Sequence, residues 1–315
     1  MKLLNAKTRK VCNFVENKVP SYAILSHTWD VDEVEFADIQ SLLPFYVWKR
    51  GWKKIKSCCK QALRQGIEYV WVDTCCIDKS SSAELQEAIN SMFRWYEKAA
   101  VCYAYLIDVN SDENPEAADS KFRKSRWFSR GWTLQELIAP REVVFFDASW
   151  SSIGTRHSLW EPISQITGIE RRIIINRTRK TMRDISVAQK MSWAAQRSTT
   201  RLEDMAYCLL GIFEVNMPLI YGEGTKAFIR LQEEIMKNSD DQTILAWGFN
   251  KPLSTYTDGS SHALATSSND FSECSHLASL GASEAGDSFS MTQRGLQLYL
   301  LVVNLYGNNI ILYYI

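Results

Sequence analysis

Four short apolar runs recur through the first 150 residues, and their spacing limits the folds open to this chain. Each run is continuous, without the alternation of a strand that has one wet face, which is typical of strands covered on both sides in a parallel sheet. The longer stretches between the runs are amphipathic, as crossover helices are. The runs cover residues 22–27, 69–73, 101–107 and 142–146.

Three helices are predicted between these strands. In residues 49–65 the apolar side chains form one stripe, with the lysines and arginines elsewhere. In residues 81–99, Ser81 can cap the helix, and Glu84 completes a capping box. A shorter helix at 133–138 ends before Pro140. This alternation predicts an α/β fold with a doubly wound parallel sheet, in which ligands bind at the carboxyl ends of the strands.

The chain changes character after residue 150. Polar links separate four helical patterns, and a stretch at 253–290 rich in Ser, Gly, Ala and Asp predicts a long mobile loop. Apolar strands are expected at 296–305 and 310–315, and because the chain stops inside the second, we expect the natural protein to continue. The expected domains are an α/β domain at 1–150, a helical region at 151–240 and a loop-rich segment with strands at 241–315. The four helical patterns cover residues 156–168, 184–196, 201–211 and 223–237.

The charge balance excludes several classes of partner. Lys and Arg number 36, and Asp and Glu also number 36, which argues against a protein built to coat nucleic acid or an anionic membrane. No apolar run approaches the roughly 20 residues that span a bilayer, and none at the start is long enough for a signal peptide. The eight cysteines are too sparse for a disulfide scaffold. We therefore expect a cytoplasmic protein with reduced thiols and with neither nucleic acid nor membrane as partner.

The sequence argues against two further kinds of site, a metal site and a nucleic-acid patch. His262, Cys274 and His276 form the only Cys/His grouping, and without a fourth ligand at plausible spacing we expect no metal. Residues 49–64 hold seven Lys or Arg and no acid, but five acids lie just upstream at 30–38, which favours a solvated helix face over a nucleic-acid patch. Neither a P-loop nor a G-x-S-x-G motif is present.

Polar and aromatic residues gather where the predicted strands end, although each has a plain structural alternative. Asp78 fits turn chemistry, His27 fits a partner of backbone groups, and the tryptophans fit a core. Convergence at one sheet edge is what favours a site. The candidates are His27 and Trp29 after the first strand, Asp73 and Asp78 after the second, and Arg126, Trp132 and Glu136 before the fourth.

Three blocks of this sequence resemble the hallmark motifs of the fungal heterokaryon incompatibility (HET) domain, in the same order and spacing. They are YAILSHTW at 22–29, VDTCCIDK at 72–79 and SRWFSRGWTLQEL at 125–137. A later stretch, with TRLEDMAYCLLGIF at 200–213 and YGEG at 221–224, is similar to the segment that follows this domain in many such proteins. The resemblance implies a fungal cytosolic protein of self/non-self recognition whose activation triggers cell death. It also implies an incompatibility partner or upstream receptor, and a homo-oligomer on activation. Some relatives continue into a NACHT domain and WD repeats, and neither module is visible here.

The resemblance extends to a distant relation with the TIR domain, a doubly wound, flavodoxin-like sheet. Many TIR domains cleave NAD with a glutamate in a helix, and the segment GWTLQEL at 131–137 looks similar. Carried over by residue, this gives only Glu136 a role, that of the catalytic group. If the domain cleaves NAD, we expect the other candidates to bind NAD as substrate, with no cofactor required: His27, Trp29, Asp73, Asp78, Arg126 and Trp132. The alternative for Glu136 is a structural role as a carboxylate near a helix N-terminus.

Three functions follow as hypotheses. The first is an NAD-consuming enzyme, in which a carboxylate near the ribose stabilises the oxocarbenium-like transition state. The second is a signalling module without chemistry that acts by self-assembly. The third is a Cys-His hydrolase that uses Cys75 or Cys76 with His27, for which no orienting group is identified.

Overall fold

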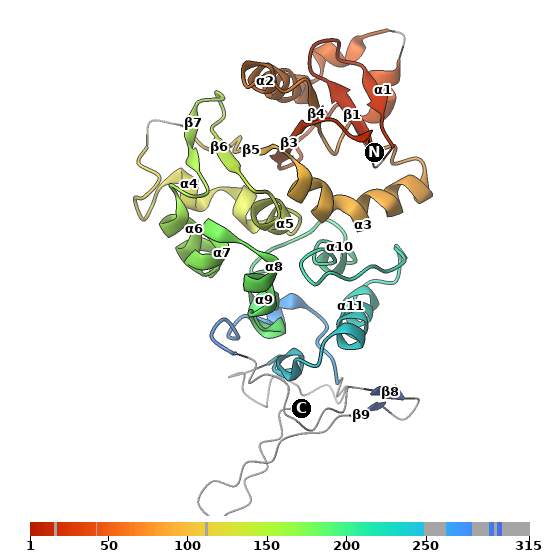
Figure 1. Ribbon diagram of the computed structural model, residues 1–315, viewed down its shortest axis with the longest axis vertical. Helices are drawn as coiled ribbons and strands as arrows, with labels where there is room; N and C mark the ends of the chain where they lie inside the picture. The colour runs from red at the N-terminus through yellow and green to blue at the C-terminus, as the bar shows by residue number, and fades with distance from the viewer. Residues whose placement is uncertain are drawn as a thin grey trace, which may run out of the picture. The chain divides into compact units, whose positions relative to one another are not determined.

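The computed structural model divides the chain into two compact units, Met1–Arg177 and Thr178–Ile315 (Figure 1). The first unit extends beyond residue 150, where we expected the α/β domain to end, because a further strand continues its sheet. The structure describes residues 1–15, 18–41, 43–110, 113–248, 263–278, 290–292 and 295–297.

The first unit is an α/β fold built on a mixed seven-stranded sheet in the order β2-β1-β4-β3-β5-β6-β7. The four middle strands, β4, β3, β5 and β6, run parallel to one another, and they are the four apolar runs of the sequence. The strands are β1 (Lys2–Asn5), β2 (Val11–Asn13), β3 (Tyr22–His27), β4 (Tyr69–Trp71), β5 (Val101–Tyr105), β6 (Val143–Phe146) and β7 (Ser152–Thr155).

The expectation of a wholly parallel sheet is wrong at both edges. Strand β1 is antiparallel to β2 and β4, and β7 is antiparallel to β6. The pairs β1–β2 and β6–β7 are antiparallel because their connections are short, and a tight turn can join only antiparallel neighbours. Asn5 Oδ1 accepts hydrogen bonds from the backbone N–H groups of Lys7 and Thr8 between β1 and β2. Asp147 Oδ1 does the same for Ser149 and Ser151 between β6 and β7.

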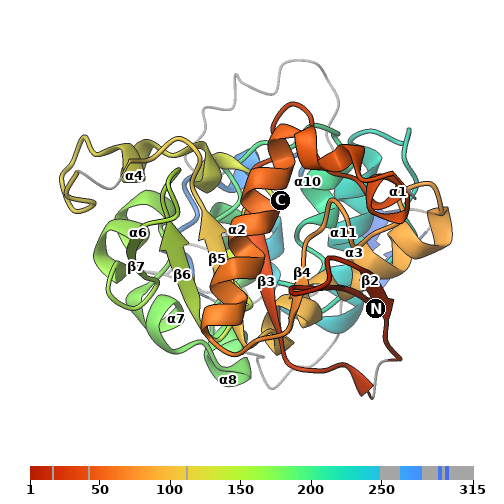
Figure 2. The same cartoon turned by 90° about the horizontal axis from the view of Figure 1, so that it is seen from above.

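Helix α2 (Arg50–Arg64) covers one face of the sheet, and α3 (Ser82–Lys98) and α5 (Thr133–Ile138) cover the other (Figures 1 and 2). These are the three helices that the sequence predicts, within a residue or two at each end. The remaining helical segments of this unit are short. They are α1 (Phe36–Gln40), η2 (Phe45–Trp48), α4 (Lys121–Lys124), η3 (Arg126–Ser129), α6 (Trp160–Thr167) and α7 (Arg171–Asn176).

The start of α3 differs from a full capping box. The Ser81 side chain accepts a hydrogen bond from the Glu84 N–H at 3.3 Å, as expected. The Glu84 carboxylate, however, accepts from the Asp78 N–H at 2.9 Å and pairs with Lys2, so it does not return to Ser81. Glu84 therefore ties the loop after β4 to strand β1.

Helix α2 also departs from the predicted pattern. Five of the seven basic residues at 49–64 are exposed, in line with a solvated face, but Lys54 is buried. Its ammonium pairs with Glu33, and the two side chains are 5% and 9% exposed. This ion pair attaches the segment that follows β3 to the first turns of α2.

The core of the first unit is aromatic and reaches the end of β3. Trp127 packs edge-on against Phe145 with ring centroids 5.5 Å apart, and Trp71 packs against Tyr96 at 5.9 Å. Both Trp127 and Tyr96 are buried, and each directs a polar group toward β3. The aromatic core therefore supports the polar groups at this edge.

The second unit is mainly helical. The predicted helices at 184–196, 201–211 and 223–237 are present, the first two shorter than expected, and that at 156–168 lies in the first unit as α6. Most of the predicted loop and C-terminal strands lies outside the described residues. The described elements are α8 (Arg179–Arg183), α9 (Val187–Ser192), α10 (Asp204–Tyr207), α11 (Lys226–Asn238), η4 (Gln242–Leu245), η6 (Ser268–Phe271), β8 (Ser290–Thr292) and β9 (Gly295–Gln297).

A polar network organises one turn of this unit. The Glu203 carboxylate accepts hydrogen bonds from the N–H groups of Gly222 and Gly224, both of which have positive φ. Arg230 holds Glu223 through two N–H donors. The network explains why the YGEG turn has two glycines, because glycine adopts such φ values without strain. Across the described residues, no helix is both long and apolar enough to cross a membrane.

Candidate functional site

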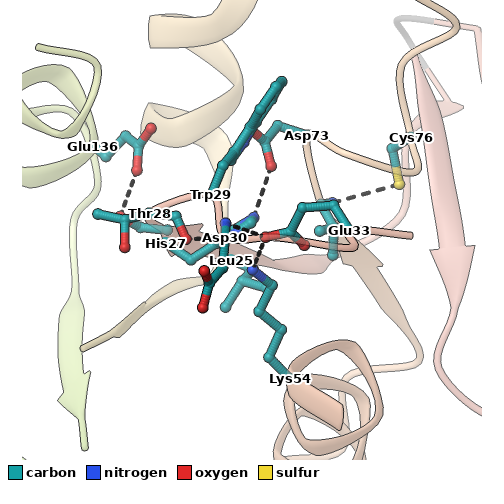
Figure 3. A network of polar contacts seen from close by, with 12 residues as sticks. Leu25, His27, Thr28, Trp29, Asp30, Glu33, Lys54, Asp73, Cys76 and Glu136 are labelled. Atoms are coloured by element: carbon teal, nitrogen blue, oxygen red, sulfur yellow. Dashed lines mark hydrogen bonds and ion pairs between the residues drawn. The ribbon is translucent and has the colours of Figure 1, made fainter. Parts of the chain in front are cut away.

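The carboxyl end of β3 is the centre of the candidate site. Strand β3 lies between β4 and β5, so the chain passes to one side of it through α2 and to the other through α3. Ligands in open α/β sheets bind where the strand order reverses in this way. The residues placed there are Ser26 and His27 at the end of β3, with Thr28 and Trp29 just beyond (Figure 3).

Glu136 reaches this strand end from α5. The Ser26 hydroxyl donates to Glu136 Oε2 at 2.5 Å, and the Trp127 indole N–H donates to Ser26 Oγ at 2.8 Å. Glu136 is 7% exposed, and every other residue of α5 is also buried. A buried tryptophan therefore positions a serine, and the serine holds the carboxyl group.

Burial controls the charge of Glu136. Loss of water raises the pKa of Glu136 to about 8, since desolvation penalises the charged form. The hydrogen bond from Ser26 lowers this pKa and offsets part of the effect, whereas the charge of Asp73 raises it. At neutral pH the carboxyl group of the free domain is thus mainly protonated.

A second cluster joins the ends of β3 and β4. His27 Nε2 lies 2.9 Å from Asp73 Oδ1, and the Trp29 indole N–H donates to Asp73 Oδ2 at 2.7 Å. The Lys79 ammonium sits 3.6 Å from the centroid of the Trp29 ring. Three of the predicted site residues, His27, Trp29 and Asp73, are therefore in direct contact.

Asp73 carries the negative charge of this cluster. Burial alone raises the pKa of Asp73, but the charge and hydrogen bond of His27, the charge of Lys79 and the Trp29 hydrogen bond together lower it to about 2. Asp73 is thus ionised at neutral pH, while Glu136 is mainly neutral. At neutral pH, one carboxyl group at this sheet edge is therefore neutral and the other is negatively charged, as in many catalytic acid–base pairs.

The other three predicted residues lie apart from these contacts. The Asp78 carboxylate accepts from the backbone N–H and hydroxyl of Ser80, which is turn chemistry. Arg126 is 44% exposed and approaches Asp30 at 3.9 Å. Trp132 is half-buried at the residue before α5. Their roles as binding residues stay predictions.

The cysteine alternative loses support. Cys75 is buried, and its hydrogen bond with Cys76 together with burial raises the pKa of the Cys75 thiol well above its ordinary value. Cys76 Sγ interacts with the backbone of Val70 and Val72. A nucleophilic cysteine needs some exposure and a lowered pKa. Both thiols are buried, and the pKa of Cys75 is raised. All eight cysteines are free thiols.

Four residues of the site were not among the predicted ones. Ser26 and Trp127 lie inside the blocks 22–29 and 125–137. Ser26 could have been found in the sequence as a polar residue at the end of an apolar strand. Tyr96 fits the apolar face of α3, and its hydroxyl, which donates to the Leu25 carbonyl at 3.1 Å, gives no pattern in sequence. Lys79 follows Asp78 in a turn. Within the described ranges, no group of His, Cys, Asp and Glu is arranged to hold a metal ion.

Comparisons with known proteins found two matches to family models. Residues 22–120 match the model of the heterokaryon incompatibility protein (HET) family. The match includes His27, Trp29 and Asp73 but ends before residues 125–137, where Trp127 and Glu136 lie. Residues 226–297 match a domain of unknown function, DUF8212.

The chain is also similar to a curated protein whose name is of the same kind. The chain is 52% identical over 228 residues to the vegetative incompatibility protein HET-E-1 of Podospora anserina. The aligned part covers 70% of this chain and 16% of the relative, so the chain spans less than a fifth of that protein. No solved structure matches the chain.

Proposed function

We propose that this chain is the effector part of a fungal heterokaryon incompatibility protein, and that it triggers regulated cell death by cleaving NAD. The HET match and the similarity to HET-E-1 support the incompatibility role. The observation that carries the enzymatic part is the buried Glu136 carboxyl group, which is held by Ser26 at the carboxyl end of the central strand. An incompatibility partner or upstream receptor would release this activity in the cytoplasm.

The strand order supports a TIR-like, flavodoxin-like fold for this unit. Numbered along the chain from β3, the four parallel strands lie in the order 2-1-3-4. The flavodoxin-like order begins in the same way, with its ligand at the switch point beside the first strand. Glu136 and the His27–Asp73–Trp29 cluster both lie at that strand.

The proposed reaction breaks the bond between nicotinamide and ribose. The bond electrons leave with nicotinamide, the ribose carbon becomes oxocarbenium-like, and water attacks it, giving nicotinamide, ADP-ribose and one proton. Glu136 must be ionised to stabilise that positive charge. The nicotinamide ring of NAD is itself cationic, and a nearby cation lowers the pKa of a carboxyl group. Substrate binding would therefore ionise Glu136 in place.

Expression of the activated protein in a fungal cell tests this function. We expect the wild type to lower cellular NAD before viability falls. Glu136→Gln keeps the shape but cannot carry charge, so it should reduce the loss of NAD by about 10²- to 10³-fold and leave the cells alive. Glu142→Gln, an exposed carboxyl change near α5, is the matched control and should kill like the wild type. Killing by Glu136→Gln with cellular NAD intact would contradict the proposal.

One observation favours the second candidate, a module that kills by self-assembly without chemistry. Four large apolar side chains stand exposed in the segment before α2: Leu43 at 58%, Phe45 at 69%, Val47 at 42% and Trp48 at 85%. Clustered exposed apolar groups mark contact surfaces more often than chance. If assembly alone kills, Trp48→Ser abolishes both self-association and killing while Glu136→Gln abolishes neither. The same expression experiment therefore separates the two candidates.

A further inference from the structure

Lys79 is a cation held in place without using its hydrogen-bond donors. Its ammonium lies over the Trp29 ring, and in the described part of the chain no oxygen accepts a hydrogen bond from it. The Lys79 side chain is half-buried, and burial lowers the pKa of its ammonium, although the charges of Asp73, Glu35 and Glu33 raise it. An ammonium has three donors, so an unpaired one at a partly buried position is available to an anion.

The Asp73 carboxylate has partners other than Lys79. Asp73 already receives one hydrogen bond on each oxygen, from His27 at 2.9 Å and from Trp29 at 2.7 Å. These bonds fix the indole, and the indole face fixes the ammonium by a cation–π contact. His27 thus contacts Asp73, Asp73 contacts Trp29, and Trp29 contacts Lys79, whose ammonium makes no hydrogen bond with the described residues.

The position of this charge relates it to Glu136. Ser26, which holds Glu136, lies in β3, and Trp29, which contacts Lys79, lies two residues beyond the end of that strand. The indole is also 47% exposed, so it offers an aromatic face beside the cation. The same sheet edge therefore carries an aromatic ring with a cation and a buried carboxyl group.

We infer that Lys79 and Trp29 form a subsite for the diphosphate of a dinucleotide, with the Lys79 ammonium donating to phosphate oxygens while the indole holds it in position. This inference rests on the proposed function, because it assigns the half of NAD that is not cleaved. It adds a binding residue outside the predicted set. It also gives His27 and Asp73 a positioning role through Trp29.

Binding of ADP-ribose to the purified chain, measured by calorimetry, tests the subsite without any cleavage. We expect wild-type protein to bind ADP-ribose more tightly than adenosine, with an affinity that falls as salt rises. Lys79→Met should weaken ADP-ribose binding about tenfold or more and leave adenosine binding unchanged. Lys79→Arg should restore most of the loss. Lys60→Met, which removes an exposed lysine from α2, is the control and should bind as the wild type does.

The outcomes separate the subsite from the reaction. Equal ADP-ribose affinity in the wild type and Lys79→Met, or a wild type that binds adenosine and ADP-ribose alike, overturns the subsite. If ADP-ribose binds through Lys79 but no nicotinamide is ever released from NAD, the subsite stands and the proposed cleavage fails. If Lys79→Met cleaves NAD with an unchanged KM, the cleavage stands and the subsite fails.

Discussion

Glu136→Gln is expected to stabilise the protein at alkaline pH and to leave its stability nearly unchanged near pH 5. The pKa of Glu136 is raised to about 8 in the folded protein by burial, against an ordinary value of 4.5. Between these two values the folded state binds more protons than the unfolded chain does. The free energy of unfolding contributed by Glu136 therefore falls as pH rises from 4.5 to 8 and is constant above that.

The size of this effect follows from the shift. Each pKa unit is worth 1.36 kcal/mol, so the difference in free energy of unfolding between variant and wild type should grow by on the order of 4 kcal/mol from pH 5 to pH 8.5. Urea unfolding of both proteins across this range measures the difference, and Glu142→Gln serves as the exposed control. A difference that does not change with pH would show that Glu136 titrates normally.

Lys54→Met is expected to lower the free energy of unfolding by about 3 kcal/mol, because it leaves a buried carboxylate without its cation. Glu33 Oε1 pairs with the Lys54 ammonium and accepts the Asp30 N–H at 2.8 Å, and its side chain is 9% exposed. Glu33 Oε2 is buried, with no hydrogen-bond partner among the described residues. Once Lys54 is gone, Glu33 must either stay charged in an apolar environment or take up a proton.

The neighbouring lysine is a close control. Lys53→Met changes an exposed residue of the same helix and should shift the free energy of unfolding by less than about 0.5 kcal/mol. Adding Glu33→Gln to Lys54→Met removes the stranded charge and should recover most of the loss. Equal stability of the two single variants in chemical unfolding would show that the Glu33–Lys54 pair contributes nothing.

The parallel centre of the fold was predictable because its signals are local. Strand β3 and helix α5 have the bounds that the apolar run at 22–27 and the stop before Pro140 predict. The edge strands were not predicted, since β2 and β7 have three and four residues and little apolar pattern. Their places depend on turns and on pairing with strands far along the chain.

The site was predicted in part for the same reason. His27, Trp29 and Asp73 lie at or just beyond the ends of two strands that lie side by side, so their convergence follows from topology. The residues that hold these groups in place could not be predicted, because their contacts join distant parts of the chain. Trp127, for example, donates a hydrogen bond to Ser26, 101 positions away. The burial of Lys54 was missed because a lysine on an amphipathic helix is ordinarily exposed, and only its partner Glu33 explains it.

At the end of β3, the neutral, buried carboxyl group of Glu136 lies on one side and the ionised carboxylate of Asp73 on the other. The Glu33–Lys54 pair and the His27–Asp73–Trp29 cluster hold the loops on either side. Such fixed polar groups in a partly dry environment suit the stabilisation of charge that develops during a reaction.

Release of nicotinamide from NAD by the purified chain, followed by chromatography over time, tests the central claim most directly. We predict release of nicotinamide and ADP-ribose in equal amounts by the wild type and by Glu142→Gln. Glu136→Gln should release them about 10²- to 10³-fold more slowly. Equal release by the wild type and Glu136→Gln, or no release from the assembled wild type at any pH between 6 and 9, would contradict the claim that this domain cleaves NAD at Glu136.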